Sequence, residues 1–169
     1  MHLSTTCGKN PPMEEPRFIA DVMLGKLAKW LRMLGCDTLY FRETKDDVLV
    51  AWAVREQRQL LTRKTRLRQR NDIQDHLFFI SDNDPLKQLG AVIARYKLTI
   101  IPPAAFTRCL NCNQRLQGIS PEQIRSRLPD YVITTQKHFS ICSGCKRIFW
   151  RGTHYENMRK ALKRIPYPP

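Results

Sequence analysis

The sequence predicts an α/β fold, in which a parallel sheet with flanking helices is followed by a small zinc-ribbon domain. The first observation is the alternation of short apolar strands with amphipathic helices through residues 17–104, which is typical of a parallel sheet covered by helices. The second is a pair of Cys-x-x-Cys motifs, at 109–112 and 142–145. The third is Pro102–Pro103, which marks a boundary between the two units.

The elements of the first unit follow from apolar periodicity and from start and stop signals. Leucines recur at helical spacing over 24–34, and Gly35 provides a natural stop. Asp46 or Asp47 is expected to cap the next helix, and Pro85 opens the last one. The predicted order is strand 17–20, helix 24–34, strand 38–41, helix 46–58, strand 60–62, a basic loop, strand 76–80 and helix 85–96.

The second unit is predicted to be built around the two cysteine pairs. Ser120–Gln123 has the pattern of a capping box and predicts a short helix that ends near Leu128. Strands are predicted at 131–135, 138–141 and 148–150, and a basic helix at 155–165. The predicted organisation is a flexible N-terminal tail at 1–16, the α/β domain at 17–104, the zinc ribbon at 105–152 and a basic C-terminal tail or helix at 153–169.

Each cysteine pair has the spacing of half a tetrahedral zinc site, so structural Zn²⁺ is predicted on Cys109, Cys112, Cys142 and Cys145. A disulfide framework is the alternative. The sequence has no secretory signal pattern and no apolar stretch long enough to cross a bilayer. We therefore expect a cytoplasmic protein, in which reduced thiols favour metal binding. Cys7 falls in the expected tail, and Cys36 is interpreted as a small buried hydrophobe.

The charge of the chain is unevenly distributed. The net charge is +14; residues 1–105 carry 17 Lys/Arg against 12 Asp/Glu, and residues 106–169 carry 12 against 3. Basic surface of this density attracts polyanions in a salt-sensitive manner. A solvated basic face and an anionic membrane are the alternatives, but the sequence has neither an amphipathic anchor nor a lipidation signal. Nucleic acid is the expected partner, without membrane association.

Acidic residues follow several predicted strands, where functional side chains collect in open parallel sheets. Clustered carboxylates bind hard cations such as Mg²⁺ or Mn²⁺, and such a metal can activate water and stabilise the leaving oxygen of a phosphodiester. Simple helix capping by Asp46, Asp47 and Asp84 is the alternative. The candidate catalytic residues are Asp21, Asp46, Asp47, Asp82 and Asp84.

Basic residues follow the third strand and accompany the cysteines. The first group is interpreted as a rim that holds RNA phosphates, with a merely solvated loop as the alternative. In the second group, arginines lie near Phe149 and Trp150, which alternate along a strand, so that at least one is expected to pack inward while exposed rings stack on unpaired bases. The candidate RNA-binding residues are Arg63, Lys64, Arg66, Arg68, Arg70, Arg147, Trp150 and Arg151.

Several stretches together resemble the Mut-seven C-terminal RNase domain family, a PIN-like nuclease group. They are residues 18–38, 60–63, 81–86, 108–112, and 142–145 with 149–154. The resemblance covers roughly residues 17–158. It implies a PIN-like α/β domain fused to a zinc ribbon and metal-dependent RNA cleavage. It also implies that Asp21, with Asp46 or Asp47, binds the metal.

One position departs from that family. Its members commonly read Leu-Thr-Arg-Asp at the end of the third strand, where this chain has Lys64 after Arg63. Lys64 can point away while Asp82 or Asp84 completes the site, can replace a second metal and hold the scissile phosphate, or can weaken catalysis.

Two functional hypotheses follow from the sequence. The first is a divalent-metal-dependent (endo)ribonuclease that hydrolyses RNA phosphodiesters. The alternative is a catalytically weakened protein that binds structured RNA or a ribonucleoprotein such as the ribosome. A DNA-binding zinc-ribbon regulator is disfavoured, because the sequence has no helix-turn-helix pattern.

Overall fold

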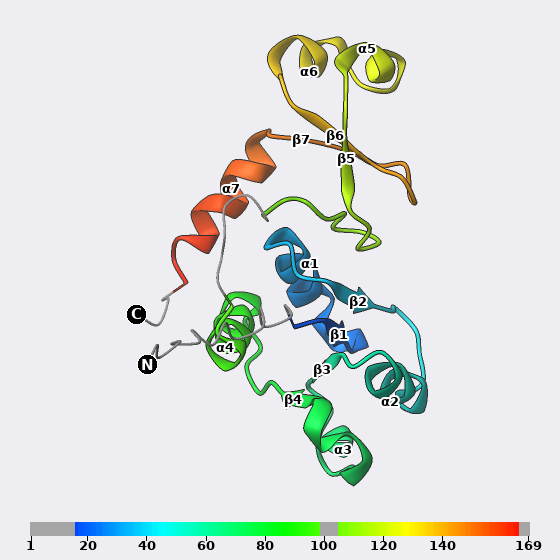
Figure 1. The fold of residues 1–169 in the computed structure, drawn as a ribbon. Helices are drawn as coiled ribbons and strands as arrows, with labels where there is room; N and C mark the ends of the chain where they lie inside the picture. Colours follow the sequence, from blue (N-terminus) through cyan, green and yellow to red (C-terminus); the bar gives the residue numbers. More distant parts are fainter. Residues whose placement is uncertain (1–15, 99–104, 166–169) are drawn as a thin grey trace, which may run out of the picture.

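The computed structural model describes residues 16–98 and 105–165 (Figure 1). Cys7, most of the predicted N-terminal tail and the predicted boundary at Pro102–Pro103 lie outside these ranges. We call residues 16–98 the α/β unit and residues 105–152 the cysteine module. Within the described ranges, none of the helices is both long and apolar enough to cross a membrane.

The α/β unit is built on a four-stranded sheet in which all neighbouring strands are parallel, as predicted. The central strands are fully buried, and their alternating side chains face opposite layers. The strands, in the spatial order of the sheet, are β2 (Thr38–Tyr40), β1 (Phe18–Ala20), β3 (Gln59–Thr62) and β4 (Leu77–Phe79).

Helices cover both faces of this sheet. The helices α1 (Gly25–Met33) and α4 (Pro85–Tyr96) pack on the face that carries Phe18 and Leu61. On the opposite face, Ile19 and Leu60 contact the other helical segments, which are α2 (Asp46–Arg55), α3 (Thr65–Arg68) and η2 (Asn71–His76). The short helix η1 (Val22–Leu24) connects β1 to α1. The predicted mixed α/β fold with flanking helices is thereby confirmed.

Two local predictions for this unit are wrong. The basic segment after β3 is not a loop but α3 and η2, because Leu67 and Ile73 insert into the apolar layer and fix its path. The N-cap of α2 is Lys45, and Asp46 and Asp47 lie in the first turn. Acidic residues there still interact favourably with the positive end of the helix dipole.

The cysteine module contains an antiparallel sheet, with the order β5 (Leu116–Ile119), β6 (Phe139–Cys142) and β7 (Ile148–Trp150). Between β5 and β6 lie α5 (Pro121–Ile124), η3 (Arg125–Arg127) and α6 (Asp130–Thr135). The predicted capping box at the start of α5 is present. This helical insertion accounts for the long spacing between the two cysteine pairs.

Helix α6 corrects the predicted strand at 131–135. Its β-branched run favours a strand, but Val132 is buried against Ile124 and Phe139. The hydroxyl of Thr135 also donates to the carbonyl of Tyr131, at 2.6 Å. Burial of the helical face therefore overrides the local preference.

Helix α7 (Thr153–Leu162) returns from the module to the α/β unit (Figure 1). Its Leu162 and the following Ile165 belong to the apolar core beneath the sheet. At the other end of the helix, Tyr155 packs on Phe106, with ring centroids 4.1 Å apart. The C-terminal helix thus holds the two units together.

A buried arginine provides the second connection between the units. Arg32 of α1, only 3% exposed, donates to the carbonyl of Thr38 at 2.8 Å. It also donates to the carbonyls of Leu110 and Asn111, both at 3.0 Å. These two carbonyls lie in the Cys109–Cys112 turn, so one guanidinium joins α1, β2 and the cysteine turn.

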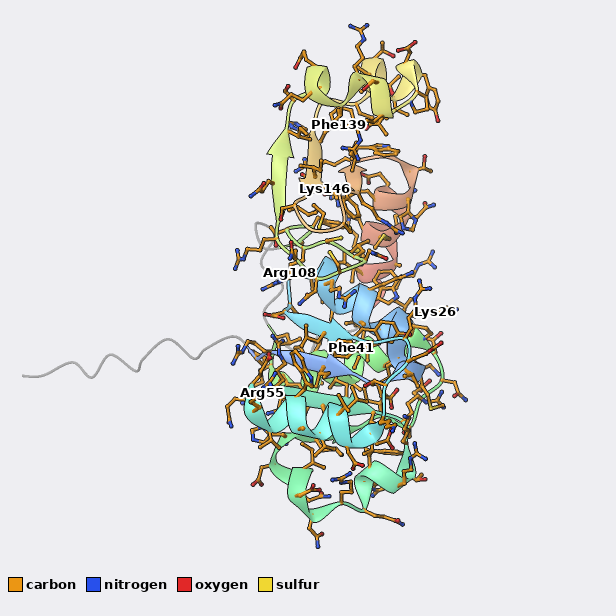
Figure 2. All side chains as sticks on the ribbon, turned by 90° about the vertical axis from the view of Figure 1, so that its right-hand side faces the viewer. Lys26, Phe41, Arg55, Arg108, Phe139 and Lys146 are labelled. Carbon is orange, nitrogen blue, oxygen red and sulfur yellow. The ribbon has the colours of Figure 1, made fainter. Side chains whose placement is uncertain are left out.

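Polar contacts around Asp37 complete this junction. The Asp37 carboxylate accepts from Arg58 at 2.8 Å and from the Asn113 amide at 2.7 Å. Arg108 donates to the carbonyl of Gly35 at 2.9 Å, and lies between the two units in Figure 2. Burial alone would raise the pKa of Asp37, but the hydrogen bonds from Arg58 and Asn113 outweigh it and hold the pKa below its usual value.

Replacing Arg32 should separate the cysteine module from α1. In Arg32→Met, three backbone carbonyls lose a donor that is itself buried, so we expect a loss of roughly 2–4 kcal/mol in the free energy of unfolding. Lys29→Met, on the exposed face of the same helix, is the matched control and should stay close to wild type. Urea denaturation measures both. An Arg32→Met protein as stable as the Lys29→Met protein would contradict this account.

Asp37 should make stability depend on acidic pH. Because its folded-state pKa is depressed, its contribution is present above the unfolded pKa of about 3.9 and is lost as the pH falls through the lower folded-state pKa. Asp37→Asn should cost roughly 1–3 kcal/mol at neutral pH. Its difference from wild type should shrink below about pH 4.

Urea denaturation at a series of pH values tests this expectation. The control is Asp75→Asn, which neutralises an exposed carboxylate and should not change how the free energy of unfolding varies with pH. If the difference in the free energy of unfolding between wild type and Asp37→Asn is the same at every pH, Asp37 acts through its shape and not through its charge.

Candidate metal centre and nucleic-acid interface

The two cysteine pairs meet at one place in the module. The four sulfurs of Cys109, Cys112, Cys142 and Cys145 all lie within 4.8 Å of one another. The closest pairs are Cys109–Cys145 at 3.5 Å and Cys112–Cys142 at 3.3 Å. Four thiolates around Zn²⁺, each about 2.3 Å from the ion, would be about 3.8 Å apart. The group is therefore a possible metal site whose donor set is consistent with zinc.

Both cysteine turns have the same backbone construction. Asn113 and Lys146, each directly after the second cysteine of its pair, adopt left-handed conformations with φ of 73° and 58°. Their N–H groups donate to the carbonyls of Cys109 and Cys142, at 2.9 Å in both turns. Each turn thus brings its two sulfurs to the same side.

The thiols differ in their readiness to ionise. Burial raises the pKa of Cys109 to about 12. Burial acts in the same direction on Cys142, but the N–H groups of Cys145 and Gly144 and the neighbouring thiols lower its pKa to about 7. A bound cation would allow all four thiols to ionise, since metal ligands are thiolates.

Asp21 lies at the carboxyl end of β1 and is fully buried. One oxygen accepts from the N–H of Met23 at 2.7 Å and caps η1. The other accepts from the hydroxyl of Thr62 at 2.5 Å and from the N–H of Arg63 at 2.9 Å. The carboxylate is thus fixed in one orientation by the end of the neighbouring strand.

Asp46 lies at the same edge of the sheet, and its two carboxylate oxygens are paired with two cationic side chains. Its oxygens are 2.7 Å from the Lys64 ammonium and 2.5 Å from Nε of Arg66. Burial alone would raise the pKa of Asp46, but the hydrogen bonds from Arg66 and Lys64 outweigh it and lower the pKa. The N–H of Lys64 donates to the hydroxyl of Thr62, at 3.0 Å. Residues 62–64 therefore link the surroundings of Asp21 and Asp46.

The other candidate acids have local partners. Asp47 is 84% exposed and pairs with Arg70, which also bridges to Asp72 at 2.6 Å. Asp84 caps α4 by accepting from two backbone N–H groups at 2.9 Å, and Asp82 accepts from the N–H of Asp84 at 2.8 Å. Within residues 16–98 and 105–165, the cysteines are the only group of three or more His, Cys, Asp or Glu side chains close enough to share a metal.

The two groups of candidate RNA-binding residues lie at opposite ends of the sheet. The segment 63–70 follows the carboxyl end of β3. The cysteine module instead contacts residues 33–37, which precede β2, and Thr38, the first residue of β2. Arg68 lies over the ring of Phe79, at 5.2 Å, whereas Arg147, Trp150 and Arg151 are exposed in the module.

Sequence reasoning missed several residues that organise these sites. Arg32 and Asp37 join the module to the α/β unit, and Thr62 bridges Asp21 to the Lys64 backbone. Thr62 could have been noticed as the polar side chain at the carboxyl end of β3, where the predicted acids lie. Arg32 carried no such signal, since it resembles its neighbours Lys26 and Lys29.

A family model for the Mut7-C RNAse domain matches residues 16–162. The chain belongs to this family. Neither a curated protein nor a solved structure matches it. Membership in the Mut7-C RNAse domain family indicates a function related to nucleic acid and makes RNA the partner that the family suggests. Against this background, Lys64 occupies the position where the resemblance leads one to expect an aspartate.

Zinc content tests the metal centre. Cys112→Ser should abolish stoichiometric zinc and destabilise the module, because metal binding supplies much of the folding free energy of such small units. Cys36→Ser, outside the cysteine group, is the matched control and should retain zinc. Elemental analysis of the purified proteins decides the outcome. Full zinc in Cys112→Ser would show that this ligand set is wrong.

Proposed function

We propose that this protein is an RNA-binding member of the Mut7-C RNAse domain family. In this proposal Lys64 pairs with Asp46 at the acidic edge of the sheet and keeps a divalent metal ion from binding there. The observation that carries the proposal is the 2.7 Å contact between the Lys64 ammonium and Asp46. Both side chains are only about 15% exposed (15% and 14%), so solvent screens this pair less than it would a surface pair. The Lys64 ammonium contacts the Asp46 oxygen that a hard cation would need as a ligand.

The electrostatic argument against a metal beside Lys64 is quantitative. A unit charge and a divalent ion about 4 Å apart repel by of order 8 kcal/mol at an effective dielectric constant of about 20. Arg66 adds a second positive charge on the other oxygen of Asp46. A divalent ion would therefore have to displace both cations from Asp46 before it could bind there.

Cations at this edge support phosphate binding. Arg66 is 73% exposed and can turn from Asp46 to a phosphate. Nε of Arg63 is buried and has no hydrogen-bond partner among the described residues, and an anion at this edge would satisfy it. In this proposal Arg63, Lys64, Arg66, Arg68 and Arg70 hold the RNA backbone at the sheet edge, and Arg147, Trp150 and Arg151 bind it in the module.

The proposal also extends to the fold of each unit, the role of the metal and the form of the partner. The α/β unit is proposed to be PIN-like and the module a zinc ribbon in which Zn²⁺ has a structural role. The partner is structured RNA, free or within a ribonucleoprotein such as the ribosome, in the cytoplasm. The charge of +9 on residues 106–169 (12 Lys/Arg against 3 Asp/Glu) supports a polyanionic partner.

Metal-dependent RNA cleavage is the second candidate, and the fixed orientation of Asp21 favours it. A buried carboxylate with three donors at a strand end is positioned as a metal ligand should be. Asp46, Asp47, Asp82 and Asp84 would have to leave their present partners to complete the site, and bound Mg²⁺ or Mn²⁺ would then activate water and stabilise the leaving oxygen. In that case Lys64 would leave Asp46 and hold the scissile phosphate.

RNA binding and cleavage should therefore separate experimentally. The wild-type protein should bind structured RNA, with an affinity that falls roughly 10- to 100-fold between about 50 and 200 mM salt. It should leave the RNA intact in Mn²⁺. Lys64→Asp restores an acid at the edge and should gain Mn²⁺-dependent cleavage, which the added substitution Asp21→Asn should remove.

Lys87→Asp is the matched control for this experiment. It reverses the charge of an exposed lysine on α4 and should bring no cleavage. Gel assays on labelled RNA report both properties. Cleavage by the wild type that Asp21→Asn abolishes would replace the first candidate by the second. An affinity that is independent of salt would contradict RNA binding in both.

A further inference from the structure

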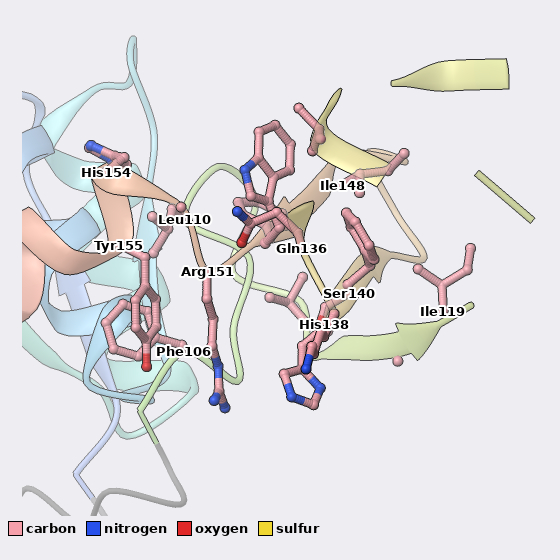
Figure 3. Close-up of a pocket in the computed structure, with 18 of the residues that line it drawn as sticks. Phe106, Leu110, Ile119, Gln136, His138, Ser140, Ile148, Arg151, His154 and Tyr155 are labelled. Atoms are coloured by element: carbon pink, nitrogen blue, oxygen red, sulfur yellow. The ribbon is translucent and has the colours of Figure 1, made fainter. Parts of the chain in front are cut away.

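A groove of about 1010 Å³ runs along the cysteine module (Figure 3). Its walls are the face of the β5–β6–β7 sheet, helix α6 and the first turns of α7. None of the sequence predictions included a cavity here, although two of its lining residues, Trp150 and Arg151, were among the candidate RNA contacts. The volume is at the upper end of the range for pockets that enclose small ligands, so it suits a short extended segment better than a duplex.

Positive charge dominates the walls of the groove. Arg108, Lys137 and Arg151 line it, and no Asp or Glu is among its described lining residues. Arg108 is occupied by its contacts with Gly35 and Asp37 of the α/β unit. Arg151 and Lys137 form no ion pair with any side chain that the structure describes. Their charges are therefore available to an anionic occupant.

Exposed aromatic rings lie in the same groove. Tyr131 is 70% exposed and Trp150 is 38% exposed, and both line the groove. Flat rings that remain open to solvent beside cations are the usual platform for unpaired bases. In Figure 3, the side chain of Arg151 lies between those of Tyr155 and His138.

The position of Trp150 depends on a neighbouring glycine. A Cβ added at Gly152 would lie 2.8 Å from the indole Nε1 of Trp150. Any side chain at position 152 would therefore displace the ring from its place. In the sheet, Trp150 is paired with the buried Phe139, so the two side chains lie next to each other on the same face.

We propose that this groove binds a single-stranded segment of RNA, with bases stacked on Tyr131 and Trp150 and phosphates held by Lys137 and Arg151. The proposal rests on the RNA-binding function proposed above and names the form of RNA that the module selects. An acidic peptide would satisfy the charges, but it would leave the two exposed rings without stacking partners. Gln136 and Ser140 on the walls offer hydrogen bonds to base edges.

The experiment uses the full-length, zinc-loaded protein with two labelled probes, a short oligouridylate and a blunt RNA duplex. Tyr131→Ala and Trp150→Ala should each weaken oligouridylate binding about 5- to 100-fold, the range that stacking on one base provides. Duplex binding should change less than about twofold, since phosphate contacts elsewhere provide it. Arg125→Ala, an exposed arginine outside the groove, is the control and should not discriminate between the probes.

Tryptophan fluorescence provides a second measurement. Oligouridylate should quench the wild-type emission, and Trp150→Phe, which keeps a flat ring, should retain most of the affinity and lose the quenching. Tyr131 is so exposed that its replacement leaves the fold intact, and zinc content checks this. If Tyr131→Ala and Trp150→Ala bind both probes with wild-type affinity, the groove proposal is wrong, whereas the proposed RNA-binding function is not contradicted.

Two further outcomes would also overturn the groove proposal. If the wild type binds neither probe, the RNA-binding function fails and the groove proposal with it. If an acidic peptide, and not oligouridylate, shows affinity that depends on Tyr131 and Trp150, the groove is a protein-binding site.

Discussion

The hydrogen bonds of one buried guanidinium hold the cysteine turn against the α/β unit. Arg32 reaches the carbonyls of Leu110 and Asn111 from α1, and these carbonyls belong to the turn that presents Cys109 and Cys112. Burial lowers the pKa of Arg32, while the nearby thiols of Cys109 and Cys112 act in the opposite direction. A Zn²⁺ ion with four thiolates would carry a net charge of −2, so Arg32 would also serve as a partial counter-charge. Binding of such an ion and attachment of the module would therefore be energetically coupled.

The attachment also fixes where the module stands relative to the sheet. The module contacts Met33, Gly35 and Asp37, which precede β2, and Thr38, which begins it, so the module docks at the amino end of the sheet. Asp21, Thr62 and Lys64 lie at the carboxyl end. A sheet of three- to four-residue strands separates these two ends by roughly 10–13 Å, at about 3.3 Å per residue. RNA that contacts both ends must therefore pass along the side of the α/β unit.

Local sequence patterns predicted the elements whose stability is local. Asp84 caps α4 and Pro85 opens it as expected, because both effects involve only neighbouring backbone groups. The strands β1 and β3 were recognisable as short apolar runs. Arg32 could not be distinguished from exposed cations on its helix, since two of its acceptors are 78 and 79 residues away. Helix α6 was mistaken for a strand because burial of Val132 is a tertiary effect.

The candidate site was predictable in position but not in its pairing. Parallel strands bring Asp21 and Asp46 to one edge, and this follows from topology alone. The partners of each carboxylate depend on side-chain reach. Thr62 and the Arg63 backbone surround Asp21, whereas Lys64 and Arg66 neutralise Asp46. No local pattern distinguishes these two environments.

The pairing of cations decides which end of the molecule attracts a polyanion more strongly. At the sheet edge, Lys64, Arg66 and Arg70 already hold carboxylates. A phosphate that binds there must exchange one anion for another, so the net gain is small. Arg151 and Lys137 in the groove have no carboxylate to release among the described residues. In the proposed RNA-binding function, first contact with RNA would therefore be favoured at the module.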